Sequence, residues 1–90
     1  MLTIFLTIKG KVQGVFYRKS ARDKAKELDI KGWVKNERNG DVIVLAQGHE
    51  NQIAKFISWC KQGPQGAKVE TVIDEKHNTD QLYNSFDILH

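Results

Sequence analysis

The sequence has very little cysteine and proline, with only Cys60 and Pro64, and it has no long apolar run. A single cysteine excludes an intramolecular disulfide framework and a metal site built from several cysteines. No apolar run approaches the ~20 residues that a helix needs to span a bilayer. Residues 1–8 lack the basic stretch that begins a signal peptide. These absences predict a cytoplasmic protein without a membrane segment.

Length and charge favour one globular domain with an anionic ligand. The chain has 90 residues, of which 40% are hydrophobic and 28% charged, as is ordinary for globular proteins. We expect one domain over residues 1–90. The net charge of +3 is uneven, because residues 1–40 carry ten basic and four acidic side chains whereas residues 41–90 carry four and seven. The first half, at +6, therefore favours an anionic ligand.

The hydrophobic pattern alternates between strand and helix periodicity. Apolar alternation and β-rich composition predict strands over residues 2–8, 30–35, 42–46, 68–75 and 85–89. Apolar side chains at helical spacing predict one helix from Tyr17 to about Asp29 and a second that ends before Gly63. Cys60 shares the apolar stripe of the second helix with Phe56, so we expect it to be a small buried hydrophobic residue.

The order β-α-β-β-α-β, with a possible short extra strand, indicates an α+β fold. Two right-handed β-α-β crossovers place the strands in one antiparallel sheet with both helices on one face. This arrangement is the ferredoxin-like sandwich. Phe5 and Trp33 are candidates for its open face. Because the fold hosts many functions, the function must be inferred from individual sites.

The segment from Gly10 to Arg18 joins the first strand to the first helix and favours phosphoryl binding. Gly10 and Gly14 permit backbone conformations that other residues avoid, so successive N–H groups can point into one concavity. The helix N-terminus adds unpaired N–H groups and a partial positive charge, and Arg18 can add a two-pronged donor. Together these donors suit a phosphoryl group. The alternative is a simple strand-to-helix turn, and the absence of Gly-Lys-Ser/Thr argues against a Walker loop.

Two spaced motifs resemble the signatures of the acylphosphatase family. The first is Ile8-x-Gly10-x-Val12-Gln13-Gly14-Val15-x-Tyr17-Arg18. The second is Gly32-Trp33-Val34-Lys35-Asn36, followed by Gly40-x-Val42 and Gly48. A third segment similar to the family is Gly63-Pro64-x-x-Ala67-x-Val69-x-x-Val72. The resemblance covers essentially the whole chain, and the family's fold is the ferredoxin-like sandwich.

The resemblance implies an enzyme that hydrolyses the carboxyl–phosphate bond of acyl phosphates to a carboxylate and inorganic phosphate. It implies a role for Asn36 in positioning the attacking water. It implies phosphoryl binding by the Arg18 side chain and by the backbone N–H groups of Gln13, Gly14, Val15, Phe16, Tyr17 and Arg18. No cofactor or metal is expected. The expected partner is a small acyl phosphate, and the protein is expected to act as a monomer without nucleic acid or membrane.

Two positions depart from the family pattern. Tyr17 stands where the family usually has Phe, and an unpaired buried hydroxyl costs about 1–3 kcal/mol, so it should find a partner or reach solvent. Asp29 stands where the family commonly has Gly, at a helix end that often requires a left-handed backbone. Neither change alters the implied chemistry.

The residues alone leave alternatives open. An RNA-binding module would share the topology and suit the basic surface, although residues 31–34 are followed by Lys35 and Asn36 rather than by the further aromatic positions of an RNP1 motif. A phosphate-binding regulatory module would keep the fold without hydrolysis. Asn36, taken alone, is also compatible with a residue that forms a turn.

Overall fold

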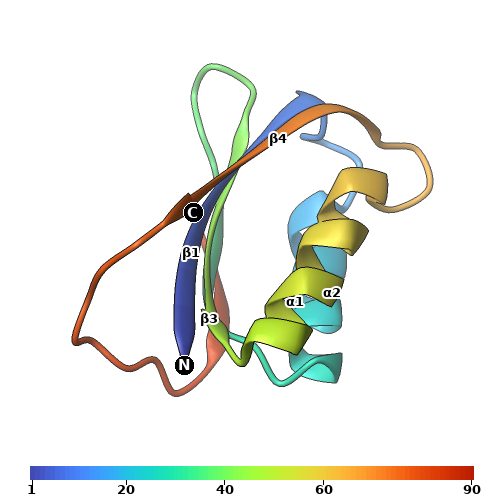
Figure 1. Ribbon diagram of the computed structural model, residues 1–90. Helices are drawn as coiled ribbons and strands as arrows, with labels where there is room; N and C mark the ends of the chain where they lie inside the picture. The colour runs from blue at the N-terminus through green and yellow to red at the C-terminus, as the bar shows by residue number, and fades with distance from the viewer.

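The computed structural model describes residues 1–90 and contains five strands and two helices (Figure 1). In chain order these are β1 (Leu2–Lys11), α1 (Tyr17–Glu27), β2 (Lys31–Asn36), β3 (Val42–Gly48), α2 (Glu50–Gln62), β4 (Lys68–Lys76) and β5 (Phe86–Leu89). Every predicted helix and strand is present, and so is the possible extra strand. Neither helix has the length and apolar character needed to cross a membrane.

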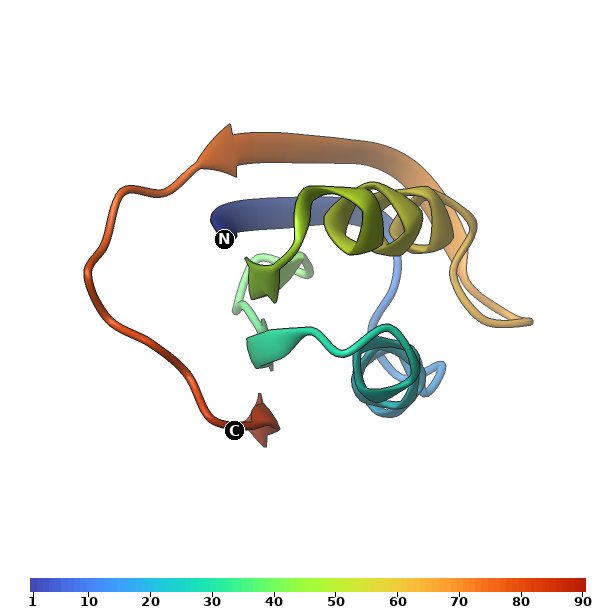
Figure 2. The ribbon, with the colours of Figure 1, turned by 60° about the horizontal axis from the view of Figure 1, so that its bottom comes forward.

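The strands form one sheet in the order β4-β1-β3-β2-β5, and both helices cover the same face (Figure 1). The predicted α+β ferredoxin-like fold is therefore confirmed. The pairs β1–β3, β1–β4 and β2–β3 are antiparallel, but β5 runs parallel to β2, so the sheet is mixed rather than wholly antiparallel. The cause is the chain path. Residues 77–85 return from β4 at one edge to β5 at the other on the side away from the helices (Figure 2).

The core lies between the helices and the covered face of the sheet. Leu6 of β1 and Val44 of β3 are fully buried there, since strand side chains alternate between the two faces. The small side chains of Ala21 and Ala25 let α1 lie close to the sheet. The buried residues of α2 lie at helical spacing and are Ile53, Phe56 and Cys60. The predicted burial of Cys60 is thus confirmed.

The open face carries aromatic and polar side chains. The rings of Phe5 and Trp33 meet edge to face there, with centroids 6.3 Å apart. The Gln47 amide donates to the carbonyl of Gln81 at 2.8 Å and accepts from the N–H of Tyr83 at 2.9 Å. These two hydrogen bonds fasten the segment that leads into β5 to the open face.

β1 extends to Lys11, beyond the predicted interruption at Gly10. A bulge between Lys9 and Gly10 shifts the pairing with β4. Gly10 has φ 130°, and a Cβ at this position would lie 2.1 Å from the carbonyl oxygen of Lys68. Glycine is therefore required for β1 and β4 to remain paired up to the start of the next loop.

The end of α1 has the left-handed backbone expected there. Asp29 has φ 56° and its N–H donates to the carbonyl of Lys26 at 3.2 Å. Its carboxylate lies 3.2 Å from Nζ of Lys31. This residue turns the chain out of α1 and into β2.

Candidate active site

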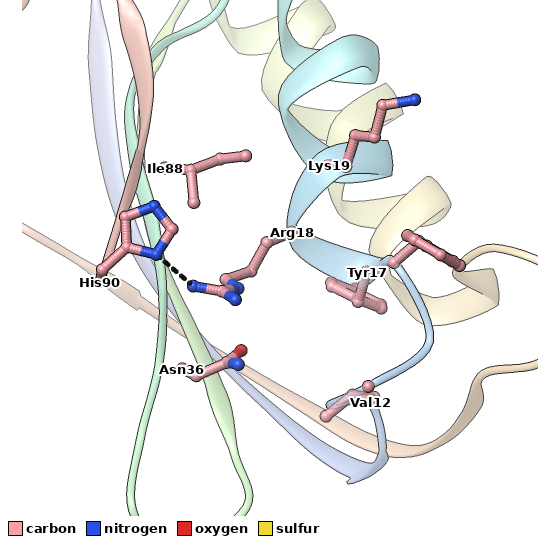
Figure 3. Close-up of a pocket in the computed structure, with 9 residues that line it drawn as sticks. Val12, Tyr17, Arg18, Lys19, Asn36, Ile88 and His90 are labelled. Atoms are coloured by element: carbon pink, nitrogen blue, oxygen red, sulfur yellow. Dashed lines mark hydrogen bonds between the residues drawn. The ribbon is translucent and has the colours of Figure 1, made fainter.

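A pocket of about 290 Å³ lies where the start of α1 faces the ends of β2 and β5 (Figure 3). The loop before α1 and its first turn contribute Val12, Gly14 and residues 16–19. β2 contributes Asn36, and the C-terminal end of the chain contributes Ile88 and His90. The fold thus brings Arg18 and Asn36 into one pocket. Gln13 and Val15 belong to the loop but are not among the lining residues.

The loop before α1 curls through two left-handed residues. Gly14 has φ 73°, and Phe16, immediately before α1, has φ 62° and ψ 24°. The N–H groups of residues 13–18 donate no hydrogen bond to any protein group. Unused amides that lead into a helix N-terminus form a concavity suited to an anion.

The Arg18 side chain extends from the first turn of α1 into the pocket, between Asn36 and His90 (Figure 3). Its Nη1 donates to the carbonyl of Leu89 at 3.2 Å and lies 3.4 Å from Nδ1 of His90. Arg18 forms no salt bridge. Because a guanidinium has five N–H donors, the group keeps both its charge and several donors for a ligand.

Asn36 ends β2, and its side chain lies opposite the Arg18 guanidinium (Figure 3). Its Oδ1 is buried and has no hydrogen-bond partner. An unpaired buried acceptor costs about 1–3 kcal/mol, so a donor bound in the pocket would recover part of that free energy. The side chain makes no hydrogen bond to a turn, which disfavours the alternative of a turn-forming residue.

The Gln13 side chain reaches out of the loop to the hairpin between β2 and β3. Its Nε2 donates to the carbonyl of Glu37 at 2.6 Å and to the carbonyl of Asp41 at 2.9 Å. Glu37 directly follows Asn36 in the chain. One side chain therefore connects the loop of free amides to the hairpin beside Asn36.

Tyr17 has the partner that its hydroxyl requires. The hydroxyl donates to the carbonyl of Cys60 at 2.8 Å, and the side chain is fully buried. Burial raises the pKa of the Tyr17 phenol above its ordinary value, and burial also raises the pKa of the Cys60 thiol to about 12. Both groups therefore stay protonated at neutral pH. Tyr17 is also among the residues that line the pocket.

Sequence reasoning did not find the contribution of the C-terminal end. Ile88 and His90 line the pocket, and His90 contacts Arg18. His90 stands alone at the C-terminus and has no spacing relation to His49 or His77. Only the pairing of β5 with β2 places it near Arg18. No signal in the sequence alone would have indicated this contact.

Known proteins match this chain along almost its full length. The family model described as acylphosphatase matches residues 4–88. An acylphosphatase of Shewanella amazonensis is 39% identical over 88 residues, which cover 98% of this chain and 97% of that protein.

Solved structures show the same likeness in three dimensions. The crystal structure of acylphosphatase from Bacillus subtilis has a TM-score of 0.97 and 31% identity, and the match covers 100% of both chains. The structure of an acylphosphatase from Coxiella burnetii has a TM-score of 0.93 and 41% identity, and covers 98% of this chain and 92% of that one. The family model, the sequence relatives and the solved structures each match almost the whole chain, and we conclude that the chain belongs to the acylphosphatase family.

Proposed function

We propose that the pocket at the start of α1 is the site at which this acylphosphatase hydrolyses the carboxyl–phosphate bond of acyl phosphates. The products are a carboxylate and inorganic phosphate. One observation carries the assignment: the unpaired charge of Arg18 and the unpartnered oxygen of Asn36 face the same pocket, beside a loop of free amides. Phosphoryl transfer requires charge stabilisation and a positioned nucleophile, and these groups supply both.

The loop and Arg18 bind the phosphoryl group. The N–H groups of residues 13–18 donate to its oxygens, and the partial positive charge at the start of α1 adds to the attraction. The Arg18 guanidinium supplies a further pair of donors and a full charge. These fixed donors stabilise the charge on the equatorial oxygens in the transition state.

Asn36 positions the attacking water. Its Oδ1 accepts a hydrogen bond from the water and aims the water oxygen at phosphorus. The new bond joins that oxygen to phosphorus, while the bond from phosphorus to the acyl oxygen breaks and its electron pair leaves on the carboxylate. An amide is not an effective base at neutral pH, so the water proton passes to a phosphate oxygen. The carboxylate is a good leaving group and needs no general acid. Asn36 therefore acts through geometry alone.

The two binding-module alternatives are not favoured. The family match spans nearly the whole chain, and the pocket holds Asn36 beside Arg18, a group that phosphate binding alone would not require. We further propose that the protein acts as a cytoplasmic single-domain monomer on small acyl phosphates, without nucleic acid or membrane. The support is that one chain supplies every residue of the site and that Cys60 is a buried free thiol.

The test compares the hydrolysis of acetyl phosphate with that of p-nitrophenyl phosphate. We expect only the acyl phosphate to be cleaved, because a phenolate leaves less readily than a carboxylate. Arg18→Ala should lower kcat/KM for acetyl phosphate by about 10³-fold, as expected for loss of a principal charge-stabilising donor. Asn36→Ala should lower kcat by about 10²-fold with little change in phosphate binding, as expected for a lost positioning contact.

The control is Arg38→Ala, which removes a positive charge from an exposed residue outside the pocket. It should retain wild-type kcat/KM. Full activity in folded Arg18→Ala or Asn36→Ala would refute the role of that residue. Cleavage of neither substrate by the folded wild-type protein would refute the function.

A further inference from the structure

We propose that the Gln13 side chain is a positioning residue, which aligns the water held by Asn36 with the phosphoryl group held by the loop. The inference rests on the proposed function. It concerns a side chain that does not line the pocket, at a residue for which the family resemblance implied a role of the backbone N–H alone.

The geometry makes Gln13 a direct link between the two halves of the site. Its backbone belongs to the loop of free amides, and its Nε2 donates to the carbonyls of Glu37 and Asp41 at 2.6 and 2.9 Å. Both N–H donors of that side chain are therefore used. Since Glu37 is bonded to Asn36, a shift of the loop is transmitted to Asn36 through one hydrogen bond and one peptide unit.

The hairpin end that receives Gln13 is itself closed. The N–H of Glu37 donates to the carbonyl of Asp41 at 2.8 Å, and the N–H of Asp41 donates to Oδ1 of Asn39 at 3.0 Å. Gln13 is thus attached to a braced turn and not to a free loop tip. A braced partner can fix the position of the loop, whereas a loose one would move with it.

The loop has few other hydrogen bonds, although Val15 packs against the core. Among residues 13–16, the only other hydrogen bond is the one that the Phe16 carbonyl accepts from Ser20. Gly14 has no atoms near the position of a Cβ, and the Phe16 side chain is 79% exposed. The Gln13 side chain is therefore the main polar restraint on the part of the loop that begins the anion site. A displacement of about 1 Å in a reacting geometry can cost about 10²-fold in rate.

The acceptor chemistry specifies an amide at this position. Both partners are backbone carbonyls, so the side chain must provide two N–H donors. Glutamate has the same length but would set a carboxylate against two carbonyl oxygens. Methionine has nearly the same length and no N–H donor. Gln13→Met therefore removes the link and largely preserves the volume.

The experiment measures acetyl phosphate hydrolysis and inhibition by inorganic phosphate in purified, folded variants. We expect Gln13→Met to lower kcat by about 10- to 100-fold, because the water and the phosphoryl group lose their alignment. The inhibition constant of phosphate should change less than about threefold, because Arg18 and the amides remain. Gln13→Asn keeps the amide but shortens its reach by one methylene, and we expect the same loss of kcat.

The decisive measurement is the kcat of the double variant that combines Gln13→Met with Asn36→Ala. If Gln13 acts through Asn36, the second substitution should lower kcat by less than about twofold, since the aligned group is already gone. The matched control is Lys9→Met. Lys9 Nζ lies 2.8 Å from the carboxylate of Asp41 and braces the same hairpin without touching the loop. Lys9→Met should keep kcat within about twofold of wild type. This should hold even when Lys9→Met and Gln13→Met lower the melting temperature by the same amount.

Each of the following results would overturn the inference: unchanged kcat in Gln13→Met, a loss explained entirely by weaker phosphate binding, or an undiminished further loss in the Asn36→Ala background. An equal loss of kcat in Lys9→Met would also overturn it, because the effect would then follow from hairpin stability. Failure of the proposed function has a different signature. In that case the wild-type protein would not cleave acetyl phosphate, or Asn36→Ala would retain full activity.

Discussion

Tyr17, in the first turn of α1, supplies a hydrogen-bond donor to the C-terminal end of α2. In α2 the carbonyl of Cys60 would ordinarily accept from the N–H four residues later, but that residue is Pro64, which has no N–H. The Tyr17 hydroxyl donates to this carbonyl at 2.8 Å instead. Its ring also packs against Trp59, with centroids 5.4 Å apart. One hydroxyl therefore satisfies an acceptor that the local sequence leaves without a donor.

Tyr17→Phe should destabilise the protein. The substitution leaves the buried carbonyl of Cys60 without its donor, and the expected decrease in the free energy of unfolding is about 1–2 kcal/mol. Urea denaturation followed by tryptophan fluorescence measures this decrease. Tyr83→Phe is the matched control, because the Tyr83 hydroxyl makes no hydrogen bond and only its backbone N–H is used. Equal stability of wild type and Tyr17→Phe would contradict the prediction.

At the scale of elements, a residue with a left-handed backbone conformation flanks α1 at each end, and the two residues serve different purposes. Its N-terminal end uses the left-handed Phe16 to direct amides into the pocket, and its C-terminal end uses the left-handed Asp29 to turn toward β2. The strain at Phe16 lies at the proposed active site, whereas the strain at Asp29 lies beyond the far end of an 11-residue helix that is about 16 Å long. A substitution that relieves the strain at Asp29 should therefore change the free energy of unfolding without changing kcat.

Asp29→Gly should stabilise the protein by roughly 0.5 kcal/mol. Glycine adopts a positive φ without the steric cost that a side chain incurs, and the larger entropy of its unfolded chain offsets only part of that gain. The exposed contact of Asp29 with Lys31 contributes little. Thermal unfolding measures the change in melting temperature. Asp29→Ala is the comparison variant, and we expect it to lower the stability because alanine lacks the conformational freedom of glycine. A lower melting temperature in Asp29→Gly than in wild type would rule out relief of strain.

The sequence predicted most elements because their apolar residues repeat at clear periods. The alternation from Leu2 to Ile8 predicted β1, and the spacing of Ile53, Phe56 and Cys60 predicted α2. The extension of β1 past Gly10 could not be predicted, since it depends on a bulge against β4. The parallel pairing of β5 depends likewise on a chain path that a four-residue strand does not encode.

The site was predictable to the extent that it lies within contiguous motifs. Glycine spacing and family resemblance indicated Arg18, Asn36 and the loop as candidates, and the structure brings Arg18 and Asn36 into one pocket. The Gln13 side chain, Ile88 and His90 were missed because their contacts join residues distant in sequence. The sequence around Gln13 does not indicate that its side chain donates to the carbonyls of Glu37 and Asp41. Candidate residues within one motif could therefore be named from the sequence, whereas contacts between distant segments could not.

At the scale of the whole molecule, the buried thiol links stability to alkaline pH. Burial raises the pKa of Cys60 from an ordinary value of 9.0 to about 12. The folded protein therefore keeps the thiol protonated at pH 9, where half of the unfolded chains have already lost this proton. The stabilisation is complete below that pH and is lost as the pH rises toward about 12.

We expect the free energy of unfolding to fall between pH 9 and pH 10, and to fall less steeply in Cys60→Ala. Denaturation curves at pH 8, 9 and 10 measure both slopes. Cys60→Ala also leaves a small cavity, so the informative quantity is the slope and not the absolute stability. Parallel slopes for the two proteins would show that Cys60 is not the group responsible.

The hydrogen bond from Arg18 to Leu89 joins residues 71 positions apart in the chain. β1, in the interior of the sheet, likewise pairs only with β3 and β4, which come much later in sequence. Such contacts form only after long loops have closed, which makes folding slow for a chain of this size, roughly milliseconds to seconds. No short fragment of the chain contains a complete pocket. The pocket is therefore complete only once the residues around Arg18 have met the C-terminal strand β5.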